Sequence, residues 1–243
     1  MNAHPPQRRF LVCCISLLFS AIAYADKGVS KNVILIIGDG FDDQHVTMGR
    51  NYLAGMSGML TLDKLPFRGA VQVETFSAAG QPVYVADSAN TATAIATGAI
   101  TSIGRVGTDI QDRDLPTIAE QAIASGLRVG LVTTSSITDA TPASFLTHVS
   151  SRSCEGPEEI LGSSYYGVPQ PTCPQDALQN NGPGSIIEQL AVSGAHVLFG
   201  GGEKFLGQIT ARGESVRSLA ERNGLRVLTE PDELKNLPTH QAV

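Results

Sequence analysis

Short runs of aliphatic and β-branched residues recur along the chain, and such runs are typical of strands. Residues 33–37 form a continuous apolar run that ends in a Gly-Asp-Gly turn, which predicts a buried parallel strand. Residues 128–134 and 196–199 predict two further strands, the second of which leads into consecutive glycines. Residues 69–76 alternate small or apolar residues with polar ones, as a strand at the margin of a sheet does.

Between these runs, apolar residues recur at helical spacing. Residues 87–98 are a run of small residues closed by glycine, which predicts a tightly packed helix. Further helices are predicted over residues 47–54, 114–125, 141–149 and 185–193. His45 and His148 are interpreted as ordinary helix residues. Alternating strands and helices predict an α/β fold, a three-layer sandwich with a mostly parallel central sheet.

The first residues predict a secretory signal peptide over residues 1–25. Basic residues around Arg8 precede the apolar run 10–23, and a small-x-small sequence ends at Ala25. A membrane anchor is the alternative, but the run is shorter than the roughly 20 residues needed to span a bilayer. We therefore expect an exported, periplasmic or secreted protein, without a membrane anchor after cleavage, whose single domain covers residues 26–243.

Composition supports one globular core and argues against a nucleic-acid partner. The chain is 42% hydrophobic and 16% charged, as ordinary α/β domains are. Its net charge is −6, and it has no Lys/Arg-rich run. Cys13 and Cys14 would leave with the signal peptide, so Cys154 and Cys173 remain. An even count in an exported protein indicates a disulfide, with two free thiols as the alternative.

Polar residues follow the predicted strands or open the predicted helices, where ligand sites of parallel sheets lie. Asp39 follows the strand predicted over residues 33–37, and Asp87 and Ser88 open a helix. Asp139 and Thr141 follow the strand predicted over residues 128–134. A serine at a helix N-terminus faces unpaired N–H groups, which suits a nucleophile and an incoming phosphate. The segment around Ser88 contains no histidine that is an obvious base, so coordination by a metal ion is the more natural way to activate the Ser88 hydroxyl.

The neighbouring residues have chemistry that suits a metal ion and a phosphate. Asp39 suits a hard cation, and Asp139 with Thr141 could support a Mg²⁺ site. Arg152 offers a planar charged fork for phosphate oxygens. Each residue also has a simpler explanation, because Asp or Ser before a helix is usually an N-cap, and an aspartate between glycines is usually a turn residue.

Three motifs, in this order, resemble those of the alkaline phosphatase family. Residues 31–40 resemble the family's first strand and its metal-binding aspartate, here Asp39. Residues 85–94 resemble its Asp-Ser-Ala nucleophile segment, and residues 139–152 resemble its Asp-Ala-Thr-Pro-Ala and arginine segment. The likeness extends from about residue 31 to about residue 205.

The resemblance implies hydrolysis of small phosphate monoesters through a phosphoserine at Ser88, with two zinc ions and one magnesium ion. Ser88 would also contact a zinc ion, and Asp39 would bridge that zinc and the magnesium. Asp139 and Thr141 would serve the magnesium site, and Arg152 would bind the phosphate. A phosphodiesterase or sulfatase on the same scaffold is disfavoured, because such relatives typically use a threonine or a modified cysteine as nucleophile.

The resemblance also assigns supporting roles. Asp87 matches the acid that steadies the arginine at Arg152. Cys154 matches a family disulfide cysteine, which supports its pairing with Cys173. Family members are commonly homodimers, so a homodimer is expected here as well.

Family members continue well beyond Val243, and the resemblance places their remaining zinc ligands in that later portion. We therefore expect a sheet that is incomplete at its C-terminal side and a chain that is prone to aggregation. The 243 residues by themselves are expected to show little or no phosphatase activity. The alternative to an active enzyme is an inactive, truncated fragment that binds phosphate or metal.

Overall fold

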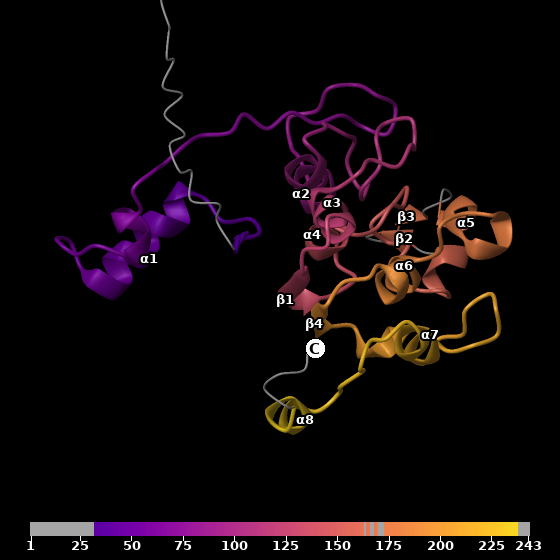
Figure 1. The fold of residues 1–243 in the computed structure, drawn as a ribbon. Helices are drawn as coiled ribbons and strands as arrows, with labels where there is room; N and C mark the ends of the chain where they lie inside the picture. The colour runs from indigo at the N-terminus through magenta and orange to yellow at the C-terminus, as the bar shows by residue number, and fades with distance from the viewer. Residues whose placement is uncertain (1–31, 163, 166–167, 170–172, 238–243) are drawn as a thin grey trace, which may run out of the picture. The chain divides into compact units, whose positions relative to one another are not determined.

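The computed structural model describes residues 32–162, 164–165, 168–169 and 173–237 (Figure 1). The predicted signal peptide, with Cys13 and Cys14, lies outside these residues. Contacts divide the chain into two units, Met1–Gly38 and Asp39–Val243. None of the helices in the described part has the length and apolarity needed to cross a membrane.

In the first unit, the predicted strand over residues 33–37 is absent. These residues form no strand, and Val33, Ile34 and Ile36 are 86%, 85% and 87% exposed. The prediction of a buried strand is therefore wrong for this structure. A buried strand needs apolar side chains, which this run supplies. It also needs a neighbouring backbone with which to form ladder hydrogen bonds.

In the second unit, two strands form a parallel pair. Strand β1, Gly130–Ser136, pairs with β4, Val197–Gly201, with Gly130 opposite Val197 (Figure 1). A Cβ on Gly200 would lie 2.7 Å from Thr133 Cγ2, so glycine permits this close approach. This parallel pair, together with the helices, confirms the α/β class. The described residues are consistent with an incomplete form of the predicted three-layer sandwich.

Helices α2, Ser88–Thr97, and α6, Ile186–Val192, lie where helices are predicted. Helix α2 ends at Gly98, whose left-handed φ of 75° closes it, and α3, Ile118–Ala124, begins later than predicted, after its N-cap Thr117. The remaining helices are α1, Asp43–Ala54; α4, Ala140–Ala143; α5, Cys173–Asp176; α7, Val216–Arg222; and α8, Pro231–Lys235. A small antiparallel pair joins β2, Ser164–Tyr165, to β3, Val168–Pro169.

Two predicted elements are replaced by irregular backbone. The helix predicted over residues 141–149 is reduced to the single turn of α4, because Val149 instead pairs with Val106 in an isolated antiparallel bridge. His148 therefore does not lie in a helix, contrary to the prediction, whereas His45 lies in α1. The marginal strand predicted over residues 69–76 is also absent, apart from isolated bridges made by Phe76.

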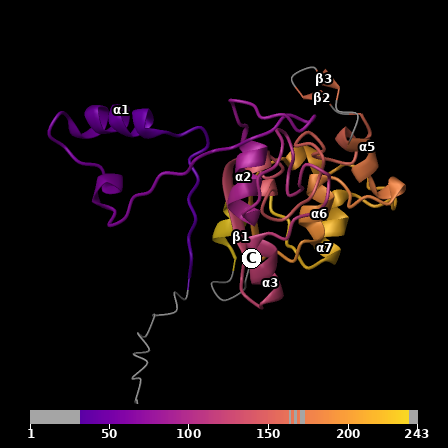
Figure 2. The same cartoon turned by 90° about the horizontal axis from the view of Figure 1, so that it is seen from above.

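Small side chains let the helices of the second unit pack closely. Ala89, Ala92 and Ala96 on α2 are at most 2% exposed, and α2 lies beside α3 in Figures 1 and 2. Larger side chains fill the other side of the core, where α6 lies beside α7. The largest fully buried ones include Phe205, Ile160, Ile186, Leu190 and Val216.

A disulfide joins Cys154 to Cys173, with an S–S distance of 2.01 Å and a Cα–Cα distance of 5.5 Å. Both cysteines are fully buried. The bond ties the start of α5 to the segment that follows Arg152, so it anchors residues close to the candidate site.

Candidate active site

Ser88 is the first residue of α2, and a reciprocal cap fixes the start of that helix. Asn90 N–H donates to Asp87 Oδ1 over 3.1 Å, and Asp87 N–H donates to Asn90 Oδ1 over 2.9 Å. The Asn90 amide also donates to the hydroxyl of Thr75, and both side chains are buried. The cap therefore holds Ser88 at the end of the helix where backbone N–H groups are unpaired and the helix dipole is positive.

Asp39 joins two hydroxyl groups that are distant in sequence. Ser88 Oγ donates to Asp39 Oδ1 over 2.9 Å, and Thr141 Oγ1 donates to Asp39 Oδ2 over 2.8 Å. Asp39 is exposed, and Gly40 after it has a left-handed φ of 66°, which turns the chain away. Three segments thus present an alcohol, a carboxylate and a second alcohol to the same place.

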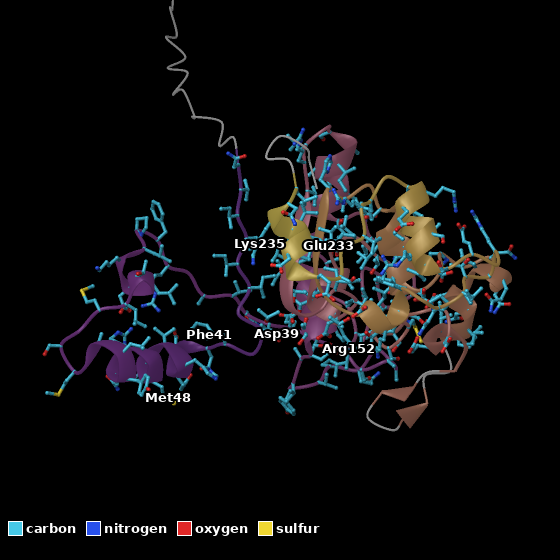
Figure 3. The ribbon with its side chains drawn as sticks, turned by 90° about the horizontal axis from the view of Figure 1, so that it is seen from below. Asp39, Phe41, Met48, Arg152, Glu233 and Lys235 are labelled. Carbon is cyan, nitrogen blue, oxygen red and sulfur yellow. A yellow bond between two sulfur atoms is a disulfide. The ribbon has the colours of Figure 1, made fainter. Side chains whose placement is uncertain are left out.

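Arg152 lies between two carboxylates, and its side chain is 15% exposed (Figure 3 labels Arg152 and Asp39). Its Nη2 donates to Asp139 Oδ1 over 2.7 Å, and its Nη1 donates to Asp87 Oδ2 over 3.4 Å. The backbone of Arg152 is also fixed, because its N–H donates to Gly104 O over 2.7 Å. The guanidinium is therefore held at two of its corners next to the residue that precedes Ser88.

Asp87 connects these two parts of the site. Its Oδ1 accepts the N–H groups of Asn90 and Gly104, the latter over 3.2 Å, while its Oδ2 accepts from Arg152. Gly104 in turn accepts the Arg152 N–H. Because both oxygens are occupied, Asp87 cannot rotate without breaking a bond to one of its partners.

Asp139 follows the carboxyl end of β1, where parallel sheets place their ligand sites. Its N–H donates to Ser136 O over 3.0 Å, and its side chain caps α4 through Ala140 N–H over 2.8 Å. The Asp139 side chain is 42% exposed, so it remains accessible to an ion from solvent.

The oxygen donors of Asp39, Asp139 and Thr141 fit a hard cation such as Mg²⁺, which prefers carboxylate and hydroxyl oxygens. Zinc favours nitrogen and sulfur ligands, and these donors do not supply them. Within the described ranges, no group of at least three His, Cys, Asp or Glu side chains is arranged to hold a metal ion. His148 and His45 are engaged elsewhere, with Glu120 and Asp42 respectively.

The structure brings together all of the residues that the sequence singles out as site candidates, namely Asp39, Asp87, Ser88, Asp139, Thr141 and Arg152. Sequence reasoning missed Asn90 and Gly104, which hold Asp87. Asn90 has a readable signal, because an aspartate followed three residues later by an amide side chain resembles a capping box. Gly104 acts through its backbone and leaves no such signal.

Comparisons with known proteins show which family the chain resembles. The family model described as "Alkaline phosphatase" matches residues 30–236. Over 218 residues the chain is 39% identical to alkaline phosphatase of Escherichia coli strain K12, covering 86% of this chain and 44% of that protein. It is also 39% identical to streptomycin-6-phosphate phosphatase of Streptomyces griseus, covering 84% of this chain and 44% of that protein.

Solved structures show the same likeness. A cold-active alkaline phosphatase from the psychrophile Shewanella sp. matches with a TM-score of 0.61 and 27% identity, over 83% of this chain and 42% of that one. A mutant of TAB5 alkaline phosphatase with Mg bound in the M3 site matches with a TM-score of 0.56 and 25% identity, over 85% and 50% of the two chains. The chain thus spans about half or less of each relative named.

Proposed function

Because the chain belongs to the alkaline phosphatase family, we propose that it acts in the hydrolysis of phosphate monoesters, with Ser88 as the group that accepts the phosphoryl group. One observation carries this proposal. Asp39 accepts hydrogen bonds from both Ser88 and Thr141 beside an arginine that is held between two aspartates. A nucleophile, an oxygen-rich cation site and an anion-binding group therefore occur together.

In the proposed reaction, Ser88 Oγ attacks phosphorus as the bond from phosphorus to the leaving alkoxide breaks, and the Ser88 hydroxyl proton passes by way of Asp39 Oδ1 to the alkoxide, which departs as the alcohol. The Ser88 hydrogen points at Asp39 Oδ1, which leaves an oxygen lone pair directed away from the carboxylate for the attack. Water then cleaves the serine–phosphorus bond and releases inorganic phosphate, which restores the hydroxyl. The position of Ser88 at the positive end of α2 stabilises the negative charge of the bound phosphoryl group.

Arg152 is proposed to bind two oxygens of the transferred phosphoryl group through its planar fork. Asp87, the less exposed of its two partners, would keep the guanidinium in place, while the more exposed Asp139 would exchange its bond for one to a cation. A cation held by Asp39, Asp139 and Thr141 would supply positive charge near the developing negative charge. Of the two zinc ions and one magnesium ion that the family resemblance implies, the oxygen donors of Asp39, Asp139 and Thr141 suit the magnesium ion, whereas zinc would need nitrogen ligands that these three residues do not supply.

Ser88→Ala tests the assignment of the nucleophile. Hydrolysis of p-nitrophenyl phosphate by the whole chain, with Mg²⁺ and Zn²⁺ added, should fall by roughly 10³-fold or more in the variant. Ser215→Ala is the matched control, because Ser215 also stands at a helix N-terminus, that of α7, outside the site. Measurable turnover that is equal in Ser88→Ala and in the unmodified chain would reject Ser88 as the nucleophile, whereas no turnover in either protein would support the inactive, truncated fragment.

Export and homodimer formation are further parts of the proposal. The basic start, apolar run and small residues up to Ala25 support a cleaved signal. Mass spectrometry of the N-terminus of the protein recovered from the periplasm or medium should identify residue 26 as the first residue. Analytical ultracentrifugation would establish the oligomeric state.

A further inference from the structure

His148 is a nearly buried histidine whose two ring nitrogens both face acceptors. Its Nδ1 lies 2.8 Å from Gly107 O, and its Nε2 lies 2.8 Å from Glu120 Oε1. Gln189 fixes its backbone from α6, since His148 N–H donates to Gln189 Oε1 and Gln189 Nε2 donates back to His148 O. The ring, whose side chain is 12% exposed, thus lies between two acceptors on a backbone that is held in place.

This geometry requires two hydrogens on the ring. A neutral imidazole carries one N–H, whereas the imidazolium donates from both nitrogens. Burial alone would lower the pKa of His148, but the bonds to Glu120 and Gly107 and the charges of Glu120 and Asp114 raise it above its usual value. Glu120 and Asp114 are the charged groups that face the ring among the described residues.

The segment that begins with His148 ends with Arg152, and it pairs along its length with residues 104–107. Val106 and Val149 exchange both backbone hydrogen bonds, over 3.2 and 2.9 Å. Arg152 N–H donates to Gly104 O at one end, and the His148 ring meets Gly107 O at the other. We call this pairing of 104–107 with 148–152 the ladder.

Gly107 makes the close approach at the histidine end. Its φ is +65°, and a Cβ there would lie 2.0 Å from Thr147 O and 2.8 Å from His148 Nδ1. Only glycine fits both the conformation and the space. At the opposite end, Gly104 N–H donates to Asp87 Oδ1, so the ladder connects His148 to Asp87, one of the two residues that orient the guanidinium of Arg152.

We infer that His148 is a positioning residue whose imidazolium form holds the ladder closed and thereby fixes the backbone of Arg152. The inference rests on the proposed role of Arg152 in binding phosphate. When the ring loses a proton, either Glu120 Oε1 faces a lone pair and loses its bond to the ring, or Gly107 O does so and keeps only the N–H of Leu115, which donates to it over 2.9 Å. The ladder is then tightest below the pKa of His148 and loosens as the pH rises through it.

The test is a pH titration of the isotopically labelled whole chain by NMR. The midpoint of the His148 ring should lie above that of an ordinary histidine, with both ring nitrogens protonated below it, and the Arg152 backbone amide resonance should shift with the same midpoint. A ring midpoint at or below that of an ordinary histidine, or an Arg152 amide that does not follow the ring, would overturn the inference. Neither readout depends on phosphatase activity.

Glu120→Gln supplies the decisive variant, because it keeps an acceptor and removes the charge. The midpoints of the His148 ring and of the Arg152 amide should fall together by about one pH unit. Glu233→Gln is the matched control, since Glu233 occupies the same capping position in α8 as Glu120 does in α3, and its side chain accepts from the backbone N–H groups of Thr229 and Glu230. An unmoved pair of midpoints in Glu120→Gln would reject the inference.

His148→Gln should abolish the titration of the Arg152 amide altogether. Should this variant fail to fold, Glu120→Gln decides the question. The proposed function fails separately, and it does so if Arg152→Ala leaves the binding of inorganic phosphate unchanged. In that case the Arg152 amide can still titrate with the His148 ring. Failure of the proposed function can therefore be distinguished from failure of the inference about His148.

Discussion

Individual carboxylates orient the reactive groups of this site. Asp39 and Asp87 each use both of their oxygens, the first for two hydroxyl groups and the second for Arg152 and backbone N–H groups. A carboxylate bonded at both oxygens cannot rotate without losing a partner, so its neighbours keep a defined direction. The orientation of Ser88 and Arg152 is therefore set by the chain itself.

Arg152→Lys should weaken phosphate binding even though the charge is retained. Lysine cannot reach Asp87 and Asp139 with two separate N–H groups of one rigid plane, so the phosphate-binding fork is lost. The affinity for inorganic phosphate, measured by calorimetry with Mg²⁺ present, should fall about 10-fold or more. Arg222→Lys in α7, where the exposed Arg222 pairs with Glu214 outside the site, should change the affinity little.

Asp176→Asn should stabilise the protein at neutral pH. Burial, and secondarily the charge of Asp112, raise the pKa of Asp176 against the lowering effect of its bonds from Ser150. A raised pKa contributes stability below the unfolded value, about 3.9, and this contribution is lost as the pH rises through the folded value.

Asparagine keeps an acceptor for Ser150 and carries no charge, so the advantage of Asp176→Asn in unfolding free energy should grow from pH 4 to pH 8. Urea denaturation across this range measures it. The exposed Asp232→Asn should show no such trend. A constant difference between Asp176→Asn and the unmodified chain would contradict the raised pKa.

Sequence reasoning singled out the candidate residues because most of them follow a predicted strand or open a helix, and because all of them lie in motifs that resemble the family's. It failed for His148, whose partners Glu120 and Gln189 lie 28 and 41 residues away. Contacts of that kind leave no period or motif in the sequence. The same holds for Gly104, since any residue offers the same backbone groups and only the fold brings them to Asp87.

Among the elements, α2 carries most of the local order of the site. Its cap, its small buried face and its glycine stop were all readable, because each depends on residues within one or two turns of the helix. Strands depend on distant partners, which explains why residues 33–37 and 69–76 were wrongly predicted as strands. Residues 141–149 failed for the same reason, since pairing of Val149 with Val106 overrides helix formation.

Asn90→Ala should unfold α2 more readily and disturb the site together with it. The substitution removes the reciprocal cap to Asp87 and the buried bond to Thr75, which together should cost about 2 kcal/mol of unfolding free energy. Chemical denaturation checks the value. Asn236→Ala, which removes an exposed amide at the end of α8, should cost far less. Equal losses of unfolding free energy in the two variants would show that the Asn90 cap stabilises the protein no more than an exposed amide does.

For the whole molecule, the disulfide limits the freedom of the unfolded chain. Cys154 and Cys173 are 19 residues apart, and a loop of that size is expected to contribute about 3 kcal/mol. The double variant C154A/C173A should lose about that much unfolding free energy. Reductant should produce a similar loss in the unmodified chain and no further loss in the double variant. A loss on reduction of the double variant would point to other thiols.

The α/β class was predictable for the molecule as a whole, because alternation of strands and helices is a property of the entire sequence. The extent of the sheet was not, since the number of strands that pair depends on which backbones meet. The described sheet contains β1 and β4, and Val132 on β1 is 75% exposed. Which residues cover this sheet depends on contacts between residues that are distant in sequence, and no local pattern encodes such contacts.

The bonds of Asp39 span 49 residues to Ser88 and 102 residues to Thr141. Closing loops of such length costs entropy that only the later, non-local contacts repay, so these bonds should form near the end of folding. Helix α2 with its local cap can form much earlier, and at that stage Ser88 has no carboxylate beside it. Chemical competence would then arise only after the chain has closed, and a folding intermediate would be inert toward phosphate esters.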